Sequence, residues 1–436
     1  MNTLEQLRAG TLHGARRLTL RARLRELPEE VYTLADTLEV LDLSGNELED
    51  LPADLARLHQ LKVIFCSNNR FTRLPEALGR CGSLEMVGFK ANRIVDAPAA
   101  SLPPRLRWLT LTDNRIATLP DELGHRPRLQ KLMLAGNRLR ALPASLAACE
   151  RLELLRISAN QLEGLPDWLL TLPRLAWLAH GGNPFSAPHE AAALDRTSLP
   201  RVPWSALDVQ ALLGEGASGH IHRAVGPDGE AVAVKVFKGE VTSDGLPSTE
   251  LAACLQAGTH PQLLPAIGRL RDHPTGADGL LMPLIGPEFR TLAAPPSFES
   301  CTRDVYDATL RLPASAVLSM GAAMADALAH LHAQGLTHGD LYAHNTLHDG
   351  HGQVRLGDFG AASFLASVPP YQAARLKALD VRALGCLLEE MVACCGDGTP
   401  ALQTAAELAG ACLQPAVDQR PCAADFALAL RRLAAG

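Results

Sequence analysis

The stretch Leu38-Glu39-Val40-Leu41-Asp42-Leu43-Ser44-Gly45-Asn46-Glu47-Leu48 decides the fold of the first half of the chain, because its pattern L-x-x-L-x-L-x-x-N-x-L returns at a regular interval. A Leu-Pro pair follows most copies, as at Leu51-Pro52. Self-similarity at such a period indicates a repeat architecture in which each copy forms one structural unit. The asparagine that closes each copy recurs after 23, 23, 22, 23, 23 and 23 residues, at Asn46, Asn69, Asn92, Asn114, Asn137, Asn160 and Asn183.

The residues of each copy predict a coil that is stable only when it packs against neighbouring coils. Leu41 and Leu43 alternate, so both point to one face of a short strand, which we expect to face the core. The asparagine amide can hydrogen-bond the backbone of neighbouring coils, whose polar groups would otherwise be buried without partners. The segment at Leu18 and Leu20 fits when one residue is dropped and Ala22 takes the asparagine position, so we predict an N-terminal cap there.

This pattern resembles the leucine-rich repeat family over residues 15–185. The resemblance implies an α/β solenoid, or horseshoe, of about eight coils. We assign residues 1–185 to this domain. Three prolines lie in the junction at 186–203, and we expect a semi-rigid linker between two domains. At the last coil His180 replaces the usual leucine, and we expect it to face the linker.

One row of strand residues predicts a partner-binding surface. Residues that point away from the core would line the concave face, in rows about 4.8 Å apart. Large exposed apolar patches commonly mark protein interaction sites; internal packing of a narrow horseshoe is the alternative. The row reads Val40, Val63, Met86, Trp108, Lys131, Leu154 and Trp177. Within it, we predict that a protein partner binds Val63, Met86, Trp108, Leu154 and Trp177.

The composition and charge of the chain exclude several classes of protein. Of the 436 residues, 47% are hydrophobic and 20% charged, which excludes disorder over most of the chain. A net charge of −6 and an aromatic content of 4% argue against a nucleic acid partner. The N-terminus lacks the pattern of a secretory signal, and the apolar run 314–331 contains Asp326 and predicts a buried helix rather than a membrane span. Ten cysteines without C-x-x-C spacing favour reduced thiols and a cytoplasmic protein.

Motifs of the second half predict nucleotide chemistry. The string G-x-G-x-x-G at Gly214, Gly216 and Gly219 is weak alone, because dinucleotide-binding folds carry it too. A dinucleotide site would place a helix next, whereas the following segment, Ala231-Val-Ala-Val-Lys235, alternates as a strand with a lysine inside it. The strings His338-Gly-Asp340 to Asn345 and Asp358-Phe-Gly360 follow.

In that order, the motifs resemble the protein kinase family over residues 204–436. The resemblance implies a minimal two-lobed α+β fold, with an N-lobe at about 204–285 and a C-lobe at about 286–436. It further implies that Asp380 starts a large buried helix and that Arg420 is a late structural arginine.

The resemblance also implies the site residues and the cofactors ATP and Mg²⁺. Asp340 and Lys235 would be catalytic, with Asp340 taking the proton of the acceptor hydroxyl. Lys235 would contact the α- and β-phosphates and pair with Glu250, which we prefer to Glu240. Asn345 and Asp358 would bind the metal. The ATP-binding residues would be Leu213, Gly214, Gly216, Gly219, Ile221, Ala233, Lys235, Glu250 and Met282.

Several positions depart from the kinase pattern. Gly339 replaces the arginine that receives an activation-loop phosphate, and Tyr342 stands where serine/threonine kinases carry lysine. The segment from Asp358 to Asp380 spans 22 residues and lacks an A-P-E motif, so Arg420 lacks its usual partner. We therefore expect a compact kinase that is constitutively active or is switched by the repeats.

Together these patterns predict a protein kinase that transfers the γ-phosphoryl group of ATP to a serine or threonine hydroxyl, while the repeats recruit a protein partner or substrate. A tyrosine or non-peptide acceptor stays open. The alternative is a weak or inactive pseudokinase that serves as a scaffold. Six histidines between positions 330 and 351 show no H-E-x-x-H spacing, which argues against a metal hydrolase.

Overall fold

The computed structural model describes residues 2–196, 199–216, 218–239, 241–396 and 398–435. The chain forms two compact units. The first comprises Met1–Leu155 and Asn160–Leu172, and the second comprises Arg156–Ala159 and Pro173–Gly436. This division differs from our predicted boundary at residue 185, because the last coil of the repeat groups with the second unit.

The first unit is built from short parallel strands, one in each repeat. Residues one repeat apart lie side by side, as Val40 does with Val63 and Trp108 with Lys131. A short helix, α1 (Leu4–Arg8), precedes them, with Thr3 as its cap. This arrangement confirms the predicted solenoid. The strands are β1 (Arg17–Thr19), β2 (Val40–Asp42), β3 (Val63–Phe65), β4 (Met86–Gly88), β5 (Trp108–Thr110), β6 (Lys131–Met133) and β7 (Leu154–Arg156).

The segments that return from each strand are 3₁₀ turns, most of which start directly after a proline. Glu76–Arg80 follows Pro75 in this way, and Asp121–His125 follows Pro120. The fixed φ of proline and its missing N–H suit the start of such a turn. The Leu-Pro pairs of the sequence thus mark where each coil turns back.

The asparagines have the predicted role. Nδ2 of Asn46 donates to the carbonyl oxygens of Leu20 and Leu43, each at 2.8 Å. Its Oδ1 accepts from the N–H groups of Ala22 and Leu24, each at 3.0 Å. One buried amide therefore satisfies four backbone groups in two adjacent coils, which explains why asparagine recurs.

The apolar row is far less exposed than we expected. The exposed fractions of Val63, Met86, Leu154 and Trp177 are 4%, 3%, 4% and 2%, whereas Trp108 is partly exposed. The expectation of an exposed apolar patch is wrong for these four residues. Strand pairing places the row residues of adjacent coils side by side, as Val63 lies beside Met86, and Trp177 also stacks on Tyr342 of the second unit.

The longer segment of the second unit, from Pro173 on, contains the last repeat strand, β8 (Trp177–Ala179). Its main sheet has the order β10-β11-β12-β14-β13-β9. Helix α3 (Pro247–Ala257) follows β12 in the chain. The strands of this sheet are β9 (Arg201–Pro203), β10 (Asp208–Glu215), β11 (Gly219–Val225), β12 (Ala231–Phe237), β13 (Gly268–Arg271) and β14 (Gly279–Pro283).

The junction is not a linker. Its alanine-rich part forms α2 (Ala187–Arg196), which packs against α3, and β9 pairs in parallel with β13 at the edge of the main sheet. Alanine is the best helix former, and edge strands tolerate proline. The prolines therefore lie at the ends of elements, with Pro188 in the first turn of α2 and Pro200 and Pro203 at the two ends of β9, and do not form a spacer.

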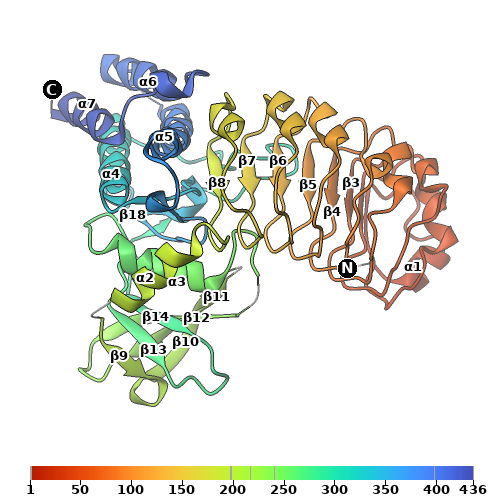
Figure 1. Ribbon diagram of the computed structural model, residues 1–436, viewed down its shortest axis with the longest axis horizontal. Helices are drawn as coiled ribbons and strands as arrows, with labels where there is room; N and C mark the ends of the chain where they lie inside the picture. The colour runs from red at the N-terminus through yellow and green to blue at the C-terminus, as the bar shows by residue number, and fades with distance from the viewer. Residues whose placement is uncertain (1, 197–198, 217, 240, 397, 436) are drawn as a thin grey trace. The chain divides into compact units, whose positions relative to one another are not determined.

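The remainder of the second unit is mainly helical. Figure 1 shows α4 (Ala314–Ala333) and α7 (Ala423–Ala435) side by side, with α5 (Pro370–Ala393) next to them. Among the described residues, α4 is the one helix long and apolar enough to cross a membrane, and 61% of that stretch is buried within the protein, so its packing accounts for its apolar character. The smaller elements are β15 (Arg290–Thr291), β16 (Leu336–Thr337), β17 (Thr346–His348), β18 (Val354–Leu356), β19 (Ser363–Phe364) and α6 (Pro400–Cys412).

Helix α5 corrects one prediction. Asp380 does not start the buried helix; it lies in the middle of α5, which begins at Pro370. The chain between Asp358 and this helix is accordingly shorter than the sequence suggested.

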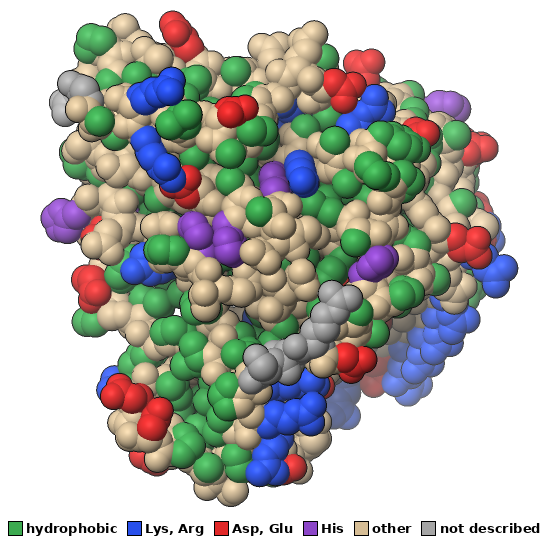
Figure 2. Space-filling view, turned by 60° about the vertical axis from the view of Figure 1, so that its left-hand side comes forward, with side chains coloured by type: hydrophobic (Ala, Val, Ile, Leu, Met, Phe, Trp, Pro, Cys, Tyr) green, Lys and Arg blue, Asp and Glu red, His purple; other side chains and the backbone are tan. Residues whose placement is uncertain are grey.

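On the face drawn in Figure 2, acidic and basic side chains are intermixed with hydrophobic ones.

Candidate active site

A small cavity lies between the main sheet, α3 and the segment after β18. Its volume is about 140 Å³. Strand β12 explains its position: Val232, Val234 and Val236 pack into the hydrophobic core, so the alternate residues face the other side of the sheet. The lining residues are Gly216, Ser218, Gly219, Ile221, Lys235, Glu250, Cys254, Leu264, Leu280, Met282, Gly357, Asp358 and Phe359.

Lys235 forms an ion pair with Glu250 inside this cavity. The side chains are 12% and 3% exposed, so water screens the pair weakly. Burial, the largest influence, lowers the pKa of Lys235, but the carboxylates of Glu250 and Asp358 outweigh it and raise the pKa above its usual value. The ammonium therefore stays charged. Glu250 is the partner we predicted, and Glu240 lies outside the described residues.

We call residues 338–345 the catalytic loop, after the role that the kinase resemblance implies for them, and nearby residues hold Asp340 in place. Nδ2 of Asn345 donates to Asp340 Oδ2 at 2.7 Å and to the Asp340 carbonyl oxygen at 3.0 Å. The N–H groups of His338 and Gly339 donate to the carboxylate of Asp380 at 2.8 and 2.9 Å. A buried carboxylate in the middle of α5 thus fixes the backbone directly before Asp340.

The segment after β18 brings Asp358 to the same site. Asp358 has a φ of 57°, a left-handed conformation that is uncommon for residues other than glycine and often marks functional sites. Oδ1 of Asp358 accepts from the N–H of Gly360 at 3.2 Å. The next side chain, Phe359, is buried against the ring of His338, with centroids 5.6 Å apart. The two loops are therefore packed together.

Gly339 explains the departure from the kinase pattern. Its φ is +70°, and an added Cβ would lie 2.5 Å from the carbonyl oxygen of Leu178 and 2.6 Å from that of Ala361. No side chain fits in this space, so arginine is excluded. The backbone of the last repeat coil occupies the place beside the catalytic loop.

Arg420 has partners that the sequence did not suggest. Its guanidinium donates to the carbonyl oxygens of Pro173, Ala378 and Gln414 at 3.0, 3.1 and 2.9 Å. Burial lowers its pKa to about 10. Carbonyl groups, one of them in the last repeat coil, thus replace the carboxylate partner that is absent from the sequence.

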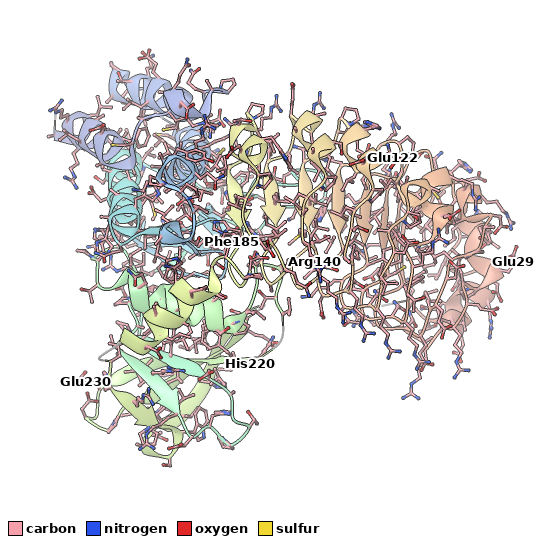
Figure 3. The ribbon with its side chains drawn as sticks, in the orientation of Figure 1. Glu29, Glu122, Arg140, Phe185, His220 and Glu230 are labelled. Carbon is pink, nitrogen blue, oxygen red and sulfur yellow. The ribbon has the colours of Figure 1, made fainter. Side chains whose placement is uncertain are left out.

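Three predicted nucleotide-binding residues do not line the cavity. Leu213 is 51% exposed, and Gly214 precedes the lining part of the glycine-rich loop. Ala233 shares the face of Lys235 and pairs with Met282, but its methyl group does not reach the cavity. His220, on β11 beside the loop, lies at the surface (Figure 3).

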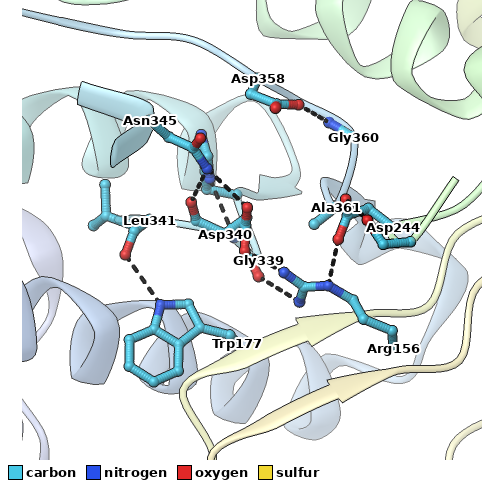
Figure 4. A network of polar contacts seen from close by, with 12 residues as sticks. Arg156, Trp177, Asp244, Gly339, Asp340, Leu341, Asn345, Asp358, Gly360 and Ala361 are labelled. Carbon is cyan, nitrogen blue, oxygen red and sulfur yellow. Dashed lines mark hydrogen bonds and ion pairs between the residues drawn. The ribbon is translucent and has the colours of Figure 1, made fainter. Parts of the chain in front are cut away.

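Other site residues were missed by sequence reasoning. Cys254 lies one turn after Glu250 on α3, and Leu280 pairs with Lys235 across the sheet, so helical and strand spacing could have suggested both. No sequence signal indicated Leu264, which lies in a loop. None indicated Arg156 either, whose guanidinium forms an ion pair with Asp340 (Figure 4).

The residues present fit a magnesium nucleotide. The exposed carboxylate of Asp358 and the amide oxygen of Asn345 are the hard oxygen ligands that Mg²⁺ prefers. Lys235 influences the same region, since its ammonium interacts with the Asp358 carboxylate. The cavity is smaller than the roughly 300–1,000 Å³ typical of ligand sites, so it encloses only part of a nucleotide.

Comparison with known families agrees with this geometry. Residues 207–379 match a family model described as a protein kinase domain. Residues 104–162 match a leucine-rich repeat model, and residues 36–80 match a model of two leucine-rich repeat copies.

Proposed function

We propose that this chain, which joins leucine-rich repeats to a protein kinase domain, transfers the γ-phosphoryl group of ATP to a serine or threonine hydroxyl of a protein. One observation carries the proposal: the Lys235–Glu250 ion pair and Asp358 line one cavity, and Asp340, held by Asn345, interacts electrostatically with the same Asp358. All five polar groups that phosphoryl transfer needs are therefore present.

Each residue has a defined task in this proposal. When bound, Mg·ATP supplies the phosphoryl group and balances its charge. Lys235 donates to phosphate oxygens, and Glu250 keeps its ammonium in place. Asn345 orients the Asp340 carboxylate, which accepts the proton of the attacking hydroxyl. Positioning and electrostatics of this kind supply most of the rate acceleration in phosphoryl transfer.

Leucine-rich repeats suggest protein binding, and we propose that the concave row binds a protein partner or substrate through its partly exposed residues Trp108 and Lys131. Val63, Met86, Leu154 and Trp177 are excluded from this role because they are buried. We also propose a cytoplasmic location, since the ten cysteines of the sequence show no C-x-x-C spacing and reduced thiols are typical of reducing compartments.

The test is phosphate transfer from radiolabelled ATP by the full-length chain with Mg²⁺, followed by phosphoamino acid analysis. We expect label on serine or threonine. Asp340→Asn and Lys235→Met should lower transfer by roughly 1,000-fold. Arg140→Gln, a change at an exposed residue of the repeat (Figure 3), should have no effect.

Three outcomes would reject parts of this proposal. Equal labelling by wild type and Asp340→Asn rejects Asp340 as the base. Label on tyrosine rejects the acceptor class. A wild-type chain that transfers no phosphate but still shifts its unfolding temperature with Mg·ATP supports the pseudokinase scaffold.

A further inference from the structure

Arg156 is the last residue of β7 and is 1% exposed. Its guanidinium makes three contacts, all drawn in Figure 4. Nε donates to Asp244 Oδ1 at 2.6 Å, Nη1 donates to the Gly339 carbonyl oxygen at 3.1 Å, and Nη2 pairs with Asp340 Oδ1. A side chain from the repeat pattern therefore contacts the carboxylate that we assign as the catalytic base.

The two carboxylates come from opposite sides of the site. Asp244 lies in the loop before α3, the helix that carries Glu250, whereas Asp340 lies in the catalytic loop. The N–H of Asp244 donates to Thr242 Oγ1 at 3.1 Å, which fixes this loop. One guanidinium thus links the segment that positions Glu250 to the segment that positions Asp340.

A buried arginine in this place needs both partners. Charged groups are costly to bury unless they are paired and hydrogen-bonded, and arginine presents a rigid fork of donors that fits two carboxylates. Removal of the guanidinium would leave Asp244 and Asp340 facing one another without a cation. The contact is accordingly a fixed part of this unit.

The adjacent coil packs against the same loop. The ring of Trp177 stacks on Tyr342 with centroids 4.3 Å apart, and its Nε1 donates to the Leu341 carbonyl oxygen at 3.0 Å. The N–H of His180 donates to Ser363 Oγ at 3.3 Å. Together with Arg156 and the carbonyl of Leu178 beside Gly339, the Trp177 contacts reach residues 339–342 in succession.

We propose that Arg156 is a positioning residue of the phosphotransfer site, which holds the Asp340 carboxylate and ties it to the loop before α3. Residues outside the segment that matches the kinase family would then complete the active site. This inference rests on the proposed function.

The geometry favours positioning over inhibition. Arg156 pairs with Oδ1 of Asp340, while Asn345 holds Oδ2. Each carboxylate oxygen has two acceptor positions, so the contact leaves room for an acceptor hydroxyl. The Asp340 side chain is still 14% exposed, which provides the approach.

The experiment measures steady-state kinetics of full-length Arg156→Gln and Arg156→Lys, with Arg140→Gln as the matched surface control. We expect Arg156→Gln to lower kcat by about 30-fold, because a small misplacement of catalytic groups has effects of that size. The KM for ATP and the Kd for Mg·ATP should stay within about twofold, since Arg156 does not line the nucleotide cavity. Arg156→Lys should recover part of kcat by restoring the charge.

Asp244→Asn gives a second, milder variant that keeps Arg156 in place. We expect a smaller loss of kcat than for Arg156→Gln, again with ATP binding unchanged. It keeps the test valid if Arg156→Gln does not fold.

Several results would overturn the inference. An unchanged or higher kcat in Arg156→Gln means that the contact is neutral or inhibitory. Parallel loss of Mg·ATP binding and of kcat in Arg156→Lys and Asp244→Asn means that Arg156 only supports the fold. If the wild type is active and Asp340→Asn abolishes that activity, the proposed function holds whether or not Arg156 is a positioning residue. A silent wild type rejects the function and this inference together.

Discussion

Trp108 and Trp177 occupy the same position in their repeats, yet their surroundings differ. Trp108 is partly buried, its ring lies 4.1 Å from the Lys131 ammonium, and its Nε1 donates to Thr110 Oγ1 at 2.8 Å. Trp177 is fully buried and stacks on Tyr342. Repeat side chains surround the first tryptophan, and the catalytic loop contacts the second.

The difference shows that a repeat position does not determine a function. In the early coils the strand residues contact residues of other coils, as sheet neighbours do. In the segments 156–159 and 173–185 they contact the catalytic loop and the loop before α3. The last coil thus keeps the repeat pattern while it belongs structurally to the second unit, and substitutions in the two regions should have different effects.

Trp177→Ala should have the largest effect of the variants that sharpen this comparison. It removes a fully buried ring and a hydrogen bond, so we expect the free energy of unfolding of the second unit to fall by about 4 kcal/mol. Trp108→Ala should cost the first unit about 1–2 kcal/mol, because its ring is partly exposed already. Chemical denaturation of the full chain, followed by a probe in each unit, measures both. Equal losses would contradict the distinction.

Gly339→Ala should cause the second-largest loss of stability. The substitution places a Cβ at 2.5–2.6 Å from two carbonyl oxygens in a left-handed conformation, so we expect a loss of about 3 kcal/mol. Gly335→Ala is the matched control: its φ is +78°, but nothing lies within 4 Å of its added Cβ. That variant should lose about 1 kcal/mol. Similar unfolding midpoints for the two variants would show that the last coil does not pack closely against the catalytic loop at Gly339.

Sequence reasoning succeeded where the pattern was local or was shared with a known family. The asparagines satisfy backbone groups of adjacent coils as their spacing predicted, and the kinase motifs identified Lys235 and Glu250, which form an ion pair. One available signal was missed: the pair Pro369-Pro370 marks the start of α5, since proline favours the first helical turn.

Contacts between distant segments could not be predicted. The repeat period assigns Arg156 to the row that contains Thr110 and Met133, and nothing in that period indicates an ion pair with a residue 184 positions away. The burial of Val63 and Met86 agrees with the alternative of internal packing, which the sequence left open and could not decide. Gly339 was identified as a departure, but its cause is the backbone of Leu178.

His180→Leu should stabilise the second unit. His180 is fully buried beside Phe185, and among the described residues neither ring nitrogen has a hydrogen-bond partner. Leucine occupies this position in other coils and removes two unsatisfied groups, so we expect a gain of about 2 kcal/mol at pH 7. Thermal unfolding measures it, with exposed His125→Gln in an early coil as the control. A destabilised His180→Leu variant would show that the imidazole makes a necessary interaction.

The same histidine predicts a pH dependence. Burial lowers its pKa to about 4, so the unfolded chain takes up a proton below pH 6.5 while the folded chain does not until near pH 4. The free energy of unfolding is therefore highest above pH 6.5 and falls with decreasing pH, by about 2 kcal/mol between pH 8 and pH 5. His180→Leu should lack this part of the decrease. An identical pH profile in variant and wild type would contradict the assignment.

Lys131→Met should have the smallest effect on stability. It tests the surroundings of Trp108, the tryptophan in the first unit. The ammonium lies over the Trp108 ring, but both side chains are partly exposed, and exposed cation–π contacts contribute about 0.5–1 kcal/mol. Methionine keeps most of the aliphatic contact with the ring. Unfolding of the first unit should shift by less than about 1 kcal/mol, and phosphate transfer should not change. A loss as large as that of Trp177→Ala would mean that the two tryptophans have equivalent structural roles.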